Sequence, residues 1–344
     1  MNDLNNIVIQ KPNEKFKEMV TSKWQQFDAN KGLGDLEKMV VKYAALTGKP
    51  PIKELKTAML LMCGDHGIAK YGVSAFPPEV TIQMIQGYIR GTAGANVMAR
   101  HAKADIFITD VGVNADLTAL SQVINCKVAM GTEDFTQGPA MTKQQAVAAI
   151  ECGMKVANDC IDQGYNLLAT AEMGIGNTTS TAAIASAILG LPPELTVGRG
   201  SGINDERMVI KREVVAQGLK INKPDSNNAI DVLCKVGGYD HAGLAGMILA
   251  GAQRGVPTMV DGVNATAAAL IAYGINPDSA AYMFCSHLSA EISHSKMLQR
   301  LQLQPIVDAG MRLGEGTGAA LAIMILQMAL DVYNKVDLSG VYDA

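Results

Sequence analysis

A glutamate, two glycines and a run of amide and hydroxyl side chains follow one another in residues 171–180, which read AEMGIGNTTS. The segment follows an apolar run typical of a strand and precedes a stretch typical of a helix, residues 181–189. Glycines let a backbone approach an anion closely, and the N–H groups of a helix start favour phosphate. The segment has neither the lysine of a Walker A loop nor the spacing of a GxGxxG fingerprint. It predicts a phosphate-binding loop, with a simple N-capped helix after a tight turn as the alternative.

A second glycine-rich stretch, residues 198–205, reads GRGSGIND and is followed by Lys211. A mobile loop that carries Arg199 and Lys211 would be able to hold a phosphate group. The alternative is a flexible surface loop before a solvated helix.

A carboxylate stands between glycines in Gly314-Glu315-Gly316. Leu313 on one side and an alanine-rich segment on the other predict apolar surroundings, which would raise the pKa of Glu315 towards that of a useful general base. A nearby helix start would lower it, so the net direction stays open. The alternative is an acidic residue of the kind favoured at any helix start.

Histidines follow two of the predicted strands, in Asp65-His66 and Ser286-His287. A Ser-His-Asp hydrolase is conceivable, but the sequence has no G-x-S-x-G nucleophile elbow. No two histidines share a helix face at i, i+4, and the six cysteines form no CxxC. We therefore expect no metal site and no cofactor, and the cysteines are typical of reduced thiols in a cytoplasmic protein.

Short apolar runs, most followed by a helical stretch, must position these residues. The runs are 57–63, 105–109, 165–171, 257–260 and 280–285. Alternating strands and helices predict an α/β fold with a mostly parallel, Rossmann-like sheet covered by helices on both faces. Ligands bind at the carboxyl ends of the strands in such sheets, so we expect one composite site there.

Both ends of the chain are helical in pattern. Residues 13–47 predict two amphipathic helices separated by a turn at 30–34, and residues 319–336 predict a long apolar helix. We expect these helices to form a small domain, residues 1–55 with 319–344, beside an α/β catalytic domain, residues 56–318.

Composition excludes several classes of protein. The 344 residues are 48% hydrophobic and carry a formal net charge of −4, which gives no basic face for nucleic acid. The N-terminus lacks the pattern of a signal peptide, and the longest apolar run falls short of the roughly 20 residues that cross a bilayer. We expect no nucleic acid or membrane partner.

Several motifs together, in this order, resemble one family. They are GDHGIAKYGVSAFPPEVT (64–81), EMGIGNTTSTAA (172–183), GRGSGINDE (198–206), VDG (260–262), SHLSAE (286–291) and DAGMRLGEGTGAALA (308–322). In these motifs the chain is similar to nicotinate-nucleotide–dimethylbenzimidazole phosphoribosyltransferases, which make the lower-ligand nucleotide of cobamides. The resemblance covers about residues 31–336.

The resemblance implies a site, carried over position by position. Glu315 would be the general base and Glu172 a second active-site carboxylate near the acceptor. The ribose phosphate would be surrounded by Gly174, Gly176, Asn177, Thr178, Lys211 and Ser289, and the acceptor by Phe76, Met84, Met173 and Leu313.

The resemblance also implies the reaction and its partners. The 5-phosphoribosyl group of nicotinate mononucleotide would move to an aromatic base of the 5,6-dimethylbenzimidazole type, giving the α-ribotide and nicotinate. Because no pyrophosphate leaves, the reaction needs no divalent metal and should proceed in EDTA. A homodimer is expected.

Two alternatives stay open at this point. Some relatives transfer the group to phenol or p-cresol and work as a heterodimer of paralogous subunits. A non-catalytic, nucleotide-binding partner subunit is another possibility, although such a subunit could lose Glu172 or Glu315 and this chain keeps both. The chain also departs from many relatives at residues 29–37 and at Ile292-Ser293-His294, and the second departure bears on the loop that carries Ser289.

Overall fold

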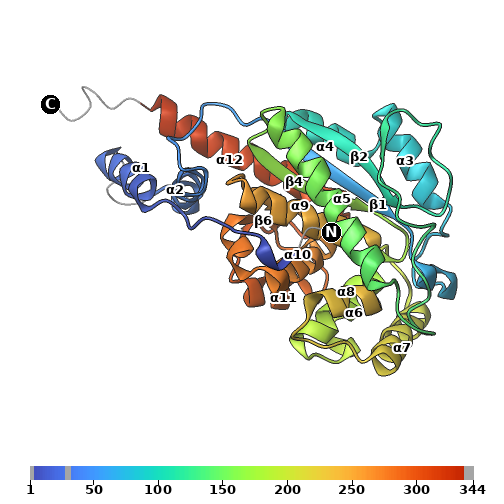
Figure 1. Cartoon of the computed structure of the whole chain (residues 1–344). Coiled ribbons are helices and arrows are strands. Elements are labelled where there is room, and N and C mark those ends of the chain that lie inside the picture. The colour runs from blue at the N-terminus through green and yellow to red at the C-terminus, as the bar shows by residue number, and fades with distance from the viewer. Residues whose placement is uncertain (1–3, 28–31, 337–344) are drawn as a thin grey trace.

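A seven-stranded parallel sheet lies at the centre of the computed structural model, which describes residues 4–27 and 32–336 (Figure 1). The strand order is β3-β2-β1-β4-β5-β6-β7. The strands are β1 (Thr57–Gly64), β2 (Ala104–Gly112), β3 (Val123–Asn125), β4 (Leu167–Met173), β5 (Thr258–Val260), β6 (Met283–His287) and β7 (Pro305–Val307).

Neighbouring strands β1 and β4 form the middle of the sheet, and every residue of both is buried. Strands covered on both faces read as continuous apolar runs, as in the TAMLLMC sequence that opens β1. The chain winds outward in one direction from β1 and in the other from β4, so the strand order reverses between them. Such a switch point opens a crevice at the carboxyl ends of its two strands.

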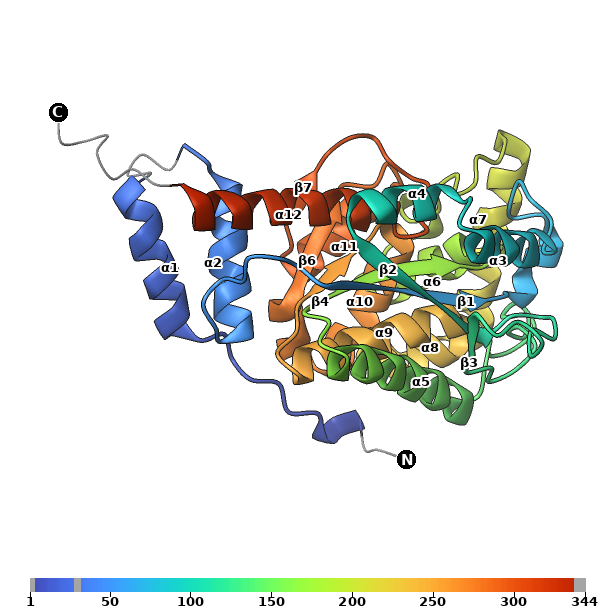
Figure 2. The ribbon, with the colours of Figure 1, turned by 90° about the horizontal axis from the view of Figure 1, so that it is seen from above.

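Helices cover both faces of the sheet, as Figure 2 shows from above. On one face lie α5 (Lys143–Asp162), α9 (Tyr239–Gln253) and α10 (Val263–Ile275); on the other lie α3 (Val80–Arg90), α4 (Gly94–His101) and α12 (Thr317–Lys335). The remaining helices are α6 (Asn177–Leu189), α7 (Asp205–Asn222), α8 (Ala229–Val236) and α11 (His294–Leu301), with 3-10 turns η1 (Leu4–Asn6), η2 (Gly67–Tyr71), η3 (Pro193–Leu195) and η4 (Pro277–Tyr282).

Two N-terminal helices, α1 (Glu14–Phe27) and α2 (Asp35–Thr47), pack together at one end of the molecule (Figure 1). Helix α12 contacts α2 and also crosses strands β4, β5 and β6. By length and composition α12 could cross a membrane, but 56% of its apolar window is buried inside the protein, as in a core helix.

The α/β architecture and the helices at both ends are confirmed. One predicted strand was wrong in part, because residues 280–282 belong to η4 and β6 begins at Met283. The three-residue edge strands β3 and β7 were not predicted. Of the predicted turn at 30–34, residues 30 and 31 lie outside the described residues. The division into two domains stays a prediction.

Candidate active site

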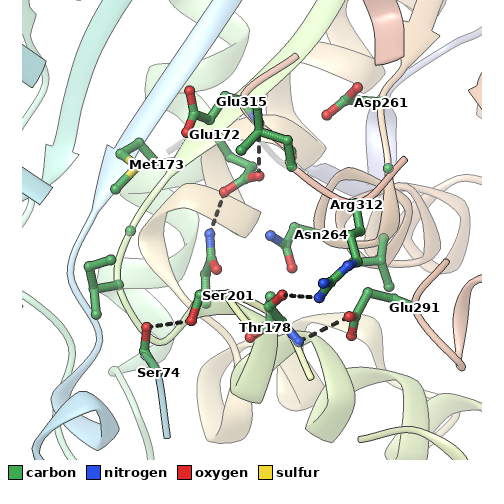
Figure 3. A pocket seen from close by; sticks show the side chains of 18 of the residues that line it. Ser74, Glu172, Met173, Thr178, Ser201, Asp261, Asn264, Glu291, Arg312 and Glu315 are labelled. Carbon is green, nitrogen blue, oxygen red and sulfur yellow. Dashed lines mark hydrogen bonds between the residues drawn. The ribbon is translucent and has the colours of Figure 1, made fainter. Parts of the chain in front are cut away.

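A cavity of about 660 Å³ opens at the carboxyl ends of the strands, at the switch point between β1 and β4 (Figure 3). Its walls come from segments that are far apart in the sequence. They include residues 172–178 after β4, 261–264 after β5, 287–291 after β6 and 312–315 before α12. The composite site expected at the sheet edge is therefore present.

Glu172 is the penultimate residue of β4 and is almost fully buried. Asn177 donates its side-chain amide to one carboxylate oxygen, and the backbone N–H of Glu315 lies 3.4 Å from the other. Burial and the negative charge of Asp240 raise the pKa of Glu172 to about 7, against the opposing effect of a hydrogen bond from Asn264. Glu172 therefore titrates near neutrality.

Glu315 lies on a loop rather than on a strand. Gly314, Glu315 and Gly316 have φ values of 79°, 61° and 82°, a left-handed run in which Glu315 is the strained residue. Burial raises its pKa; the neighbouring Tyr88 hydroxyl works against this, and the charge of Asp261 adds to the rise. In Figure 3 the two glutamates lie side by side at one end of the cavity.

Asp261 holds the loop that carries Glu315. Its carboxylate accepts the N–H groups of Gly316, at 3.1 Å, and of Ala319, at 2.9 Å. These donors belong to the start of α12, where backbone N–H groups lack helical partners and favour a negative charge. Asp261 thus fixes the point at which α12 begins, two residues after Glu315.

The glycine-rich segment after β4 turns sharply into α6. Gly174 passes so close to the carbonyl oxygen of Gly64 that any Cβ atom would overlap it, and Gly176 has a φ of 99°. Helix α6 begins at Asn177, four residues earlier than predicted, so Asn177 and Thr178 form its first turn at the cavity. A helix start that faces a cavity is a suitable place for a phosphate.

Lys211 lies behind this helix start instead of lining the cavity. Its side chain is fully buried, and its ammonium group donates to the Thr178 hydroxyl at 2.7 Å and to the Gly198 carbonyl at 3.2 Å. Burial lowers its pKa to about 8, and the charge of Glu291 opposes that fall. Lys211 therefore contacts the predicted phosphate position only through Thr178.

The glycine-rich loop at residues 198–202 covers the same end of the cavity. Gly200 donates its N–H to Glu291 at 2.9 Å, and its carbonyl lies 3.4 Å from the Arg312 guanidinium. Ser201 is joined to Ser74 by a hydrogen bond of 2.9 Å, visible in Figure 3. Arg312 is exposed and lines the cavity, so it is the cation among the described residues that faces this space.

The wall opposite the polar end is apolar. Phe76 and Leu313 are 53% and 62% exposed, large values for side chains of this kind. They line the cavity together with Val80, Met84 and Met173. An exposed apolar surface inside a cavity suits a flat aromatic ligand.

All of the predicted site residues except Lys211 line this one cavity: Glu172, Glu315, Gly174, Gly176, Asn177, Thr178, Ser289, Phe76, Met84, Met173 and Leu313. Their individual roles stay predictions.

Sequence reasoning gave other members of the wall no role in this site, and it considered His287 only for a hydrolase. Asp261, His287 and Glu291 had a usable signal, because each follows a predicted strand. Asn264 and Arg312 had none, because nothing in the local pattern separates them from ordinary polar residues.

One cluster of metal-binding residue types occurs among the described residues: His66, Asp240 and His241, all buried, with ligand atoms within 4.8 Å of one another. His66 bonds Ser180 at 2.9 Å through Nδ1, and His241 bonds Thr181 at 2.8 Å through Nε2. The remaining ring nitrogens face the Asp240 carboxylate, at 3.2 Å and 2.9 Å. The three side chains therefore contact one another and the start of α6, which leaves them as a buried polar network.

The fold and the cavity together define a ligand-binding protein of the open α/β class, with carboxylates placed for acid–base chemistry. An open parallel sheet offers a ligand crevice at its switch point, with a helix start at one end and two carboxylates beside an apolar wall.

Comparison with known proteins agrees with this class and narrows it. A family model described as "Phosphoribosyltransferase" matches residues 9–339. Curated relatives from Chloroflexus aggregans and Geobacter sulfurreducens are each 45% identical over 304 residues, which are 88% of this chain and 86% of theirs. Both are named nicotinate-nucleotide–dimethylbenzimidazole phosphoribosyltransferase.

A solved structure of the protein of that name from Thermus thermophilus is 35% identical and superposes with a TM-score of 0.90. The match covers 96% of this chain and 99% of that one. The chain belongs to this phosphoribosyltransferase family, so it is a transferase and not a hydrolase.

Proposed function

We propose that this enzyme transfers the 5-phosphoribosyl group of nicotinate mononucleotide to an aromatic base of the 5,6-dimethylbenzimidazole type. The products are the α-ribotide and nicotinate, a step in cobamide biosynthesis. The observation that carries the proposal is the cavity itself, in which two carboxylates stand between an apolar wall and a glycine-lined helix start. The near-complete match to relatives that bear the name of this reaction supports it.

The donor occupies the polar end of the cavity in this proposal. Its phosphate faces the start of α6 at Gly176–Thr178, with Ser289 and the Arg312 guanidinium within the same wall. The helix start supplies N–H donors and a favourable dipole, and Arg312 supplies a full positive charge. Lys211 supports this end from behind by holding Thr178.

The acceptor lies against the apolar wall formed by Phe76, Met84 and Leu313. This wall offers area and polarizable contact but few hydrogen-bonding groups, so it selects for a planar, apolar ring. The two glutamates at its edge face the ring nitrogen that reacts.

The chemistry exchanges one C–N bond for another. The nicotinate ring carries a positive charge at its ribosyl nitrogen, so it leaves with the electron pair of its bond to C1′, and C1′ gains oxocarbenium character. The acceptor nitrogen attacks from the opposite face, which turns a β-linkage into an α-linkage. The acceptor's N–H proton passes to the Glu315 carboxylate, which burial makes a stronger base than an exposed glutamate.

We also propose that the enzyme works in the cytoplasm as a homodimer. The proposal rests on the family resemblance and on the scattered, unpaired cysteines among the described residues.

The test is a competition. Purified enzyme is incubated with nicotinate mononucleotide and equal amounts of 5,6-dimethylbenzimidazole and p-cresol, with and without EDTA, and the products are separated by mass spectrometry. We expect the N-linked α-ribotide and nicotinate in equal amounts, at the same rate in EDTA. Only O-linked aryl ribosides would overturn the choice of acceptor, and no product from either acceptor would overturn the function.

A further inference from the structure

A chain of buried polar side chains leads from Glu172 away from the cavity. Asn264, on the wall, hydrogen bonds Glu172 and lowers its pKa, although burial and the Asp240 charge raise it more. On its far side the oxygen of Asn264 lies 2.8 Å from the Thr181 hydroxyl, which lies 2.8 Å from Nε2 of His241. In Figure 3 the nitrogen of Asn264 points towards the two glutamates and its oxygen points away.

This series of polar side chains ends at Asp240, which lies between two histidines. Its carboxylate contacts Nδ1 of His241 at 2.9 Å and Nε2 of His66 at 3.2 Å, and all three side chains are almost fully buried. Burial opposes the ionisation of Asp240, but the two histidines outweigh it and hold its pKa far below the usual range. Asp240 is therefore ionised and lies between one ring nitrogen of each histidine.

The direction of these bonds follows from counting hydrogens. Thr181 has one hydroxyl hydrogen and two neighbours, His241 Nε2 and the Asn264 oxygen. The hydrogen can serve Asn264 only if Nε2 of His241 carries its own hydrogen and donates to Thr181. Because Nδ1 of the same ring faces the ionised Asp240, it carries a hydrogen as well, so this arrangement pairs an imidazolium with the Asp240 carboxylate. Asn264 then turns its amide nitrogen towards Glu172, as a carboxylate requires.

The opposite arrangement has a different consequence. If the Thr181 hydroxyl donates to His241, the Asn264 amide must turn over to satisfy Thr181, and its oxygen then faces Glu172. Two oxygens in contact need a proton between them, so this arrangement stabilises the protonated form of Glu172. The direction of the hydrogen bonds between His241, Thr181 and Asn264 is thus linked to the ionisation of Glu172.

We propose that His241 is a positioning residue that, held by Asp240 and acting through Thr181, fixes the Asn264 amide with its nitrogen towards Glu172 and so keeps that carboxylate ionised for turnover. This inference rests on the proposed function for its effect on rate, but the protonation of Glu172 can be measured without it. His241 touches neither substrate nor reacting atoms, since it is buried behind α6.

The pH dependence of Glu172 also reflects its other neighbours. The titratable groups that act on it or share its surroundings are Glu315, Asp240, Asp261, Tyr88, Cys63 and, at the other end of the network, His241, His66 and Asp65. A variant that cuts the chain at Thr181 leaves every one of these groups in place.

Thr181→Val is therefore the central variant, because valine has the shape of threonine without the hydroxyl. Thr181→Ser keeps the hydroxyl and should restore the wild-type behaviour. Thr179→Val is the matched control: Thr179 lies on the same helix, is fully buried, and its hydroxyl has no hydrogen-bond partner within the described ranges. Thermal unfolding of each variant checks that it folds.

The first readout is the titration of Glu172, followed by carbon-13 NMR of carboxyl-labelled enzyme and assigned with Glu172→Gln. In Thr181→Val we expect the midpoint to rise above that of the wild type by roughly one pH unit, because the Asn264 amide is no longer held with its nitrogen towards the charged form of Glu172. Thr181→Ser and Thr179→Val should titrate as wild type does. An unchanged or lower midpoint in Thr181→Val overturns the proposal.

The second readout is the pH profile of kcat/KM with nicotinate mononucleotide and 5,6-dimethylbenzimidazole. The acid limb of Thr181→Val should move to higher pH, so that its activity at pH 6 falls roughly tenfold while its KM for the donor stays unchanged. Equal losses at every pH would show a merely structural role and contradict the proposal. Failure of the wild-type enzyme to form product would refute the proposed function, while the NMR titration would still decide the linkage.

Discussion

Glu172 and Glu315, two of the carboxylates that line the cavity, are neighbours but are held in opposite ways. Glu172 sits on a central strand, is almost fully buried, and receives hydrogen bonds from Asn177 and Asn264. Glu315 sits on a loop in a strained left-handed conformation between two glycines. Burial raises the pKa of both. From this difference we infer two roles. Glu172, on the strand, sets the electrostatic potential in the cavity, and Glu315, on the loop, contacts the acceptor of the proposed reaction.

The largest effect is expected from Glu315→Gln. The glutamine keeps the size of the side chain but cannot take the acceptor proton, so kcat should fall by about 10²–10⁴-fold with little change in KM for nicotinate mononucleotide. Steady-state kinetics at saturating acceptor would measure this. Turnover equal to that of wild type would show that Glu315 is not the base and would reverse the comparison.

A smaller effect, on stability, is expected from Glu172→Gln. Because the folded protein raises the pKa of Glu172 from 4.5 to about 7, folding binds a proton there more tightly than the unfolded chain does. Wild-type stability from this group is therefore present below about pH 4.5 and is lost as the pH rises through 7. The variant does not titrate, so above pH 7 it should be more stable than wild type by up to on the order of 3 kcal/mol, less what its weakened hydrogen bonds cost.

Urea unfolding of both proteins at pH 5 and pH 8 would measure this difference. The exposed substitution Glu18→Gln is the control and should leave the pH dependence unchanged. If Glu172→Gln loses stability with pH as steeply as wild type does, then Glu172 is not the group that titrates near neutrality.

The smallest effect is expected from Gly314→Ala, which tests how the two carboxylates are coupled. The new methyl group would lie 2.7 Å from a carboxylate oxygen of Glu172, at a backbone φ of 79°. Gly310→Ala is the control, because its φ of 63° costs similar strain while nothing lies within 4 Å of the added atom.

We expect Gly310→Ala to cost about 1 kcal/mol of stability and Gly314→Ala roughly twice that. Only Gly314→Ala should also lower kcat/KM, because only it displaces Glu172. Equal losses in both variants would mean that backbone strain is the whole effect and that the two carboxylates are not coupled through this glycine.

The sequence was most informative where a pattern of apolar and polar residues recurs along the chain. Buried apolar runs predicted β1, β4 and β5 because central parallel strands are covered on both faces. Edge strands such as β3 and β7 have three residues each and only partial burial, so no periodic pattern marks them. The site was predictable for the same reason, because strand-end residues such as Glu172 must converge at one edge of the sheet.

The rest depended on tertiary packing. Nothing local shows that Lys211 turns away from the cavity into the space behind Thr178, or that Asp261 reaches across to the start of α12. The partners of His66 and His241 lie on α6 and α9, so their network is visible only once those helices are placed. Sequence spacing fixes which residues can share an edge, but contacts between elements fix what each side chain does there.

Helix α12 gives the position of Glu315 a mechanical meaning. The helix is 19 residues long, or about 28 Å, with one end anchored by Asp261 beside Glu315 and with α2 packed against it. Because α12 also packs on β4, β5 and β6, a shift of the N-terminal helices at its far end is resisted along the helix before it reaches the anchored end. Glu315, the general base of the proposed mechanism, would thereby keep its place when α1 and α2 move.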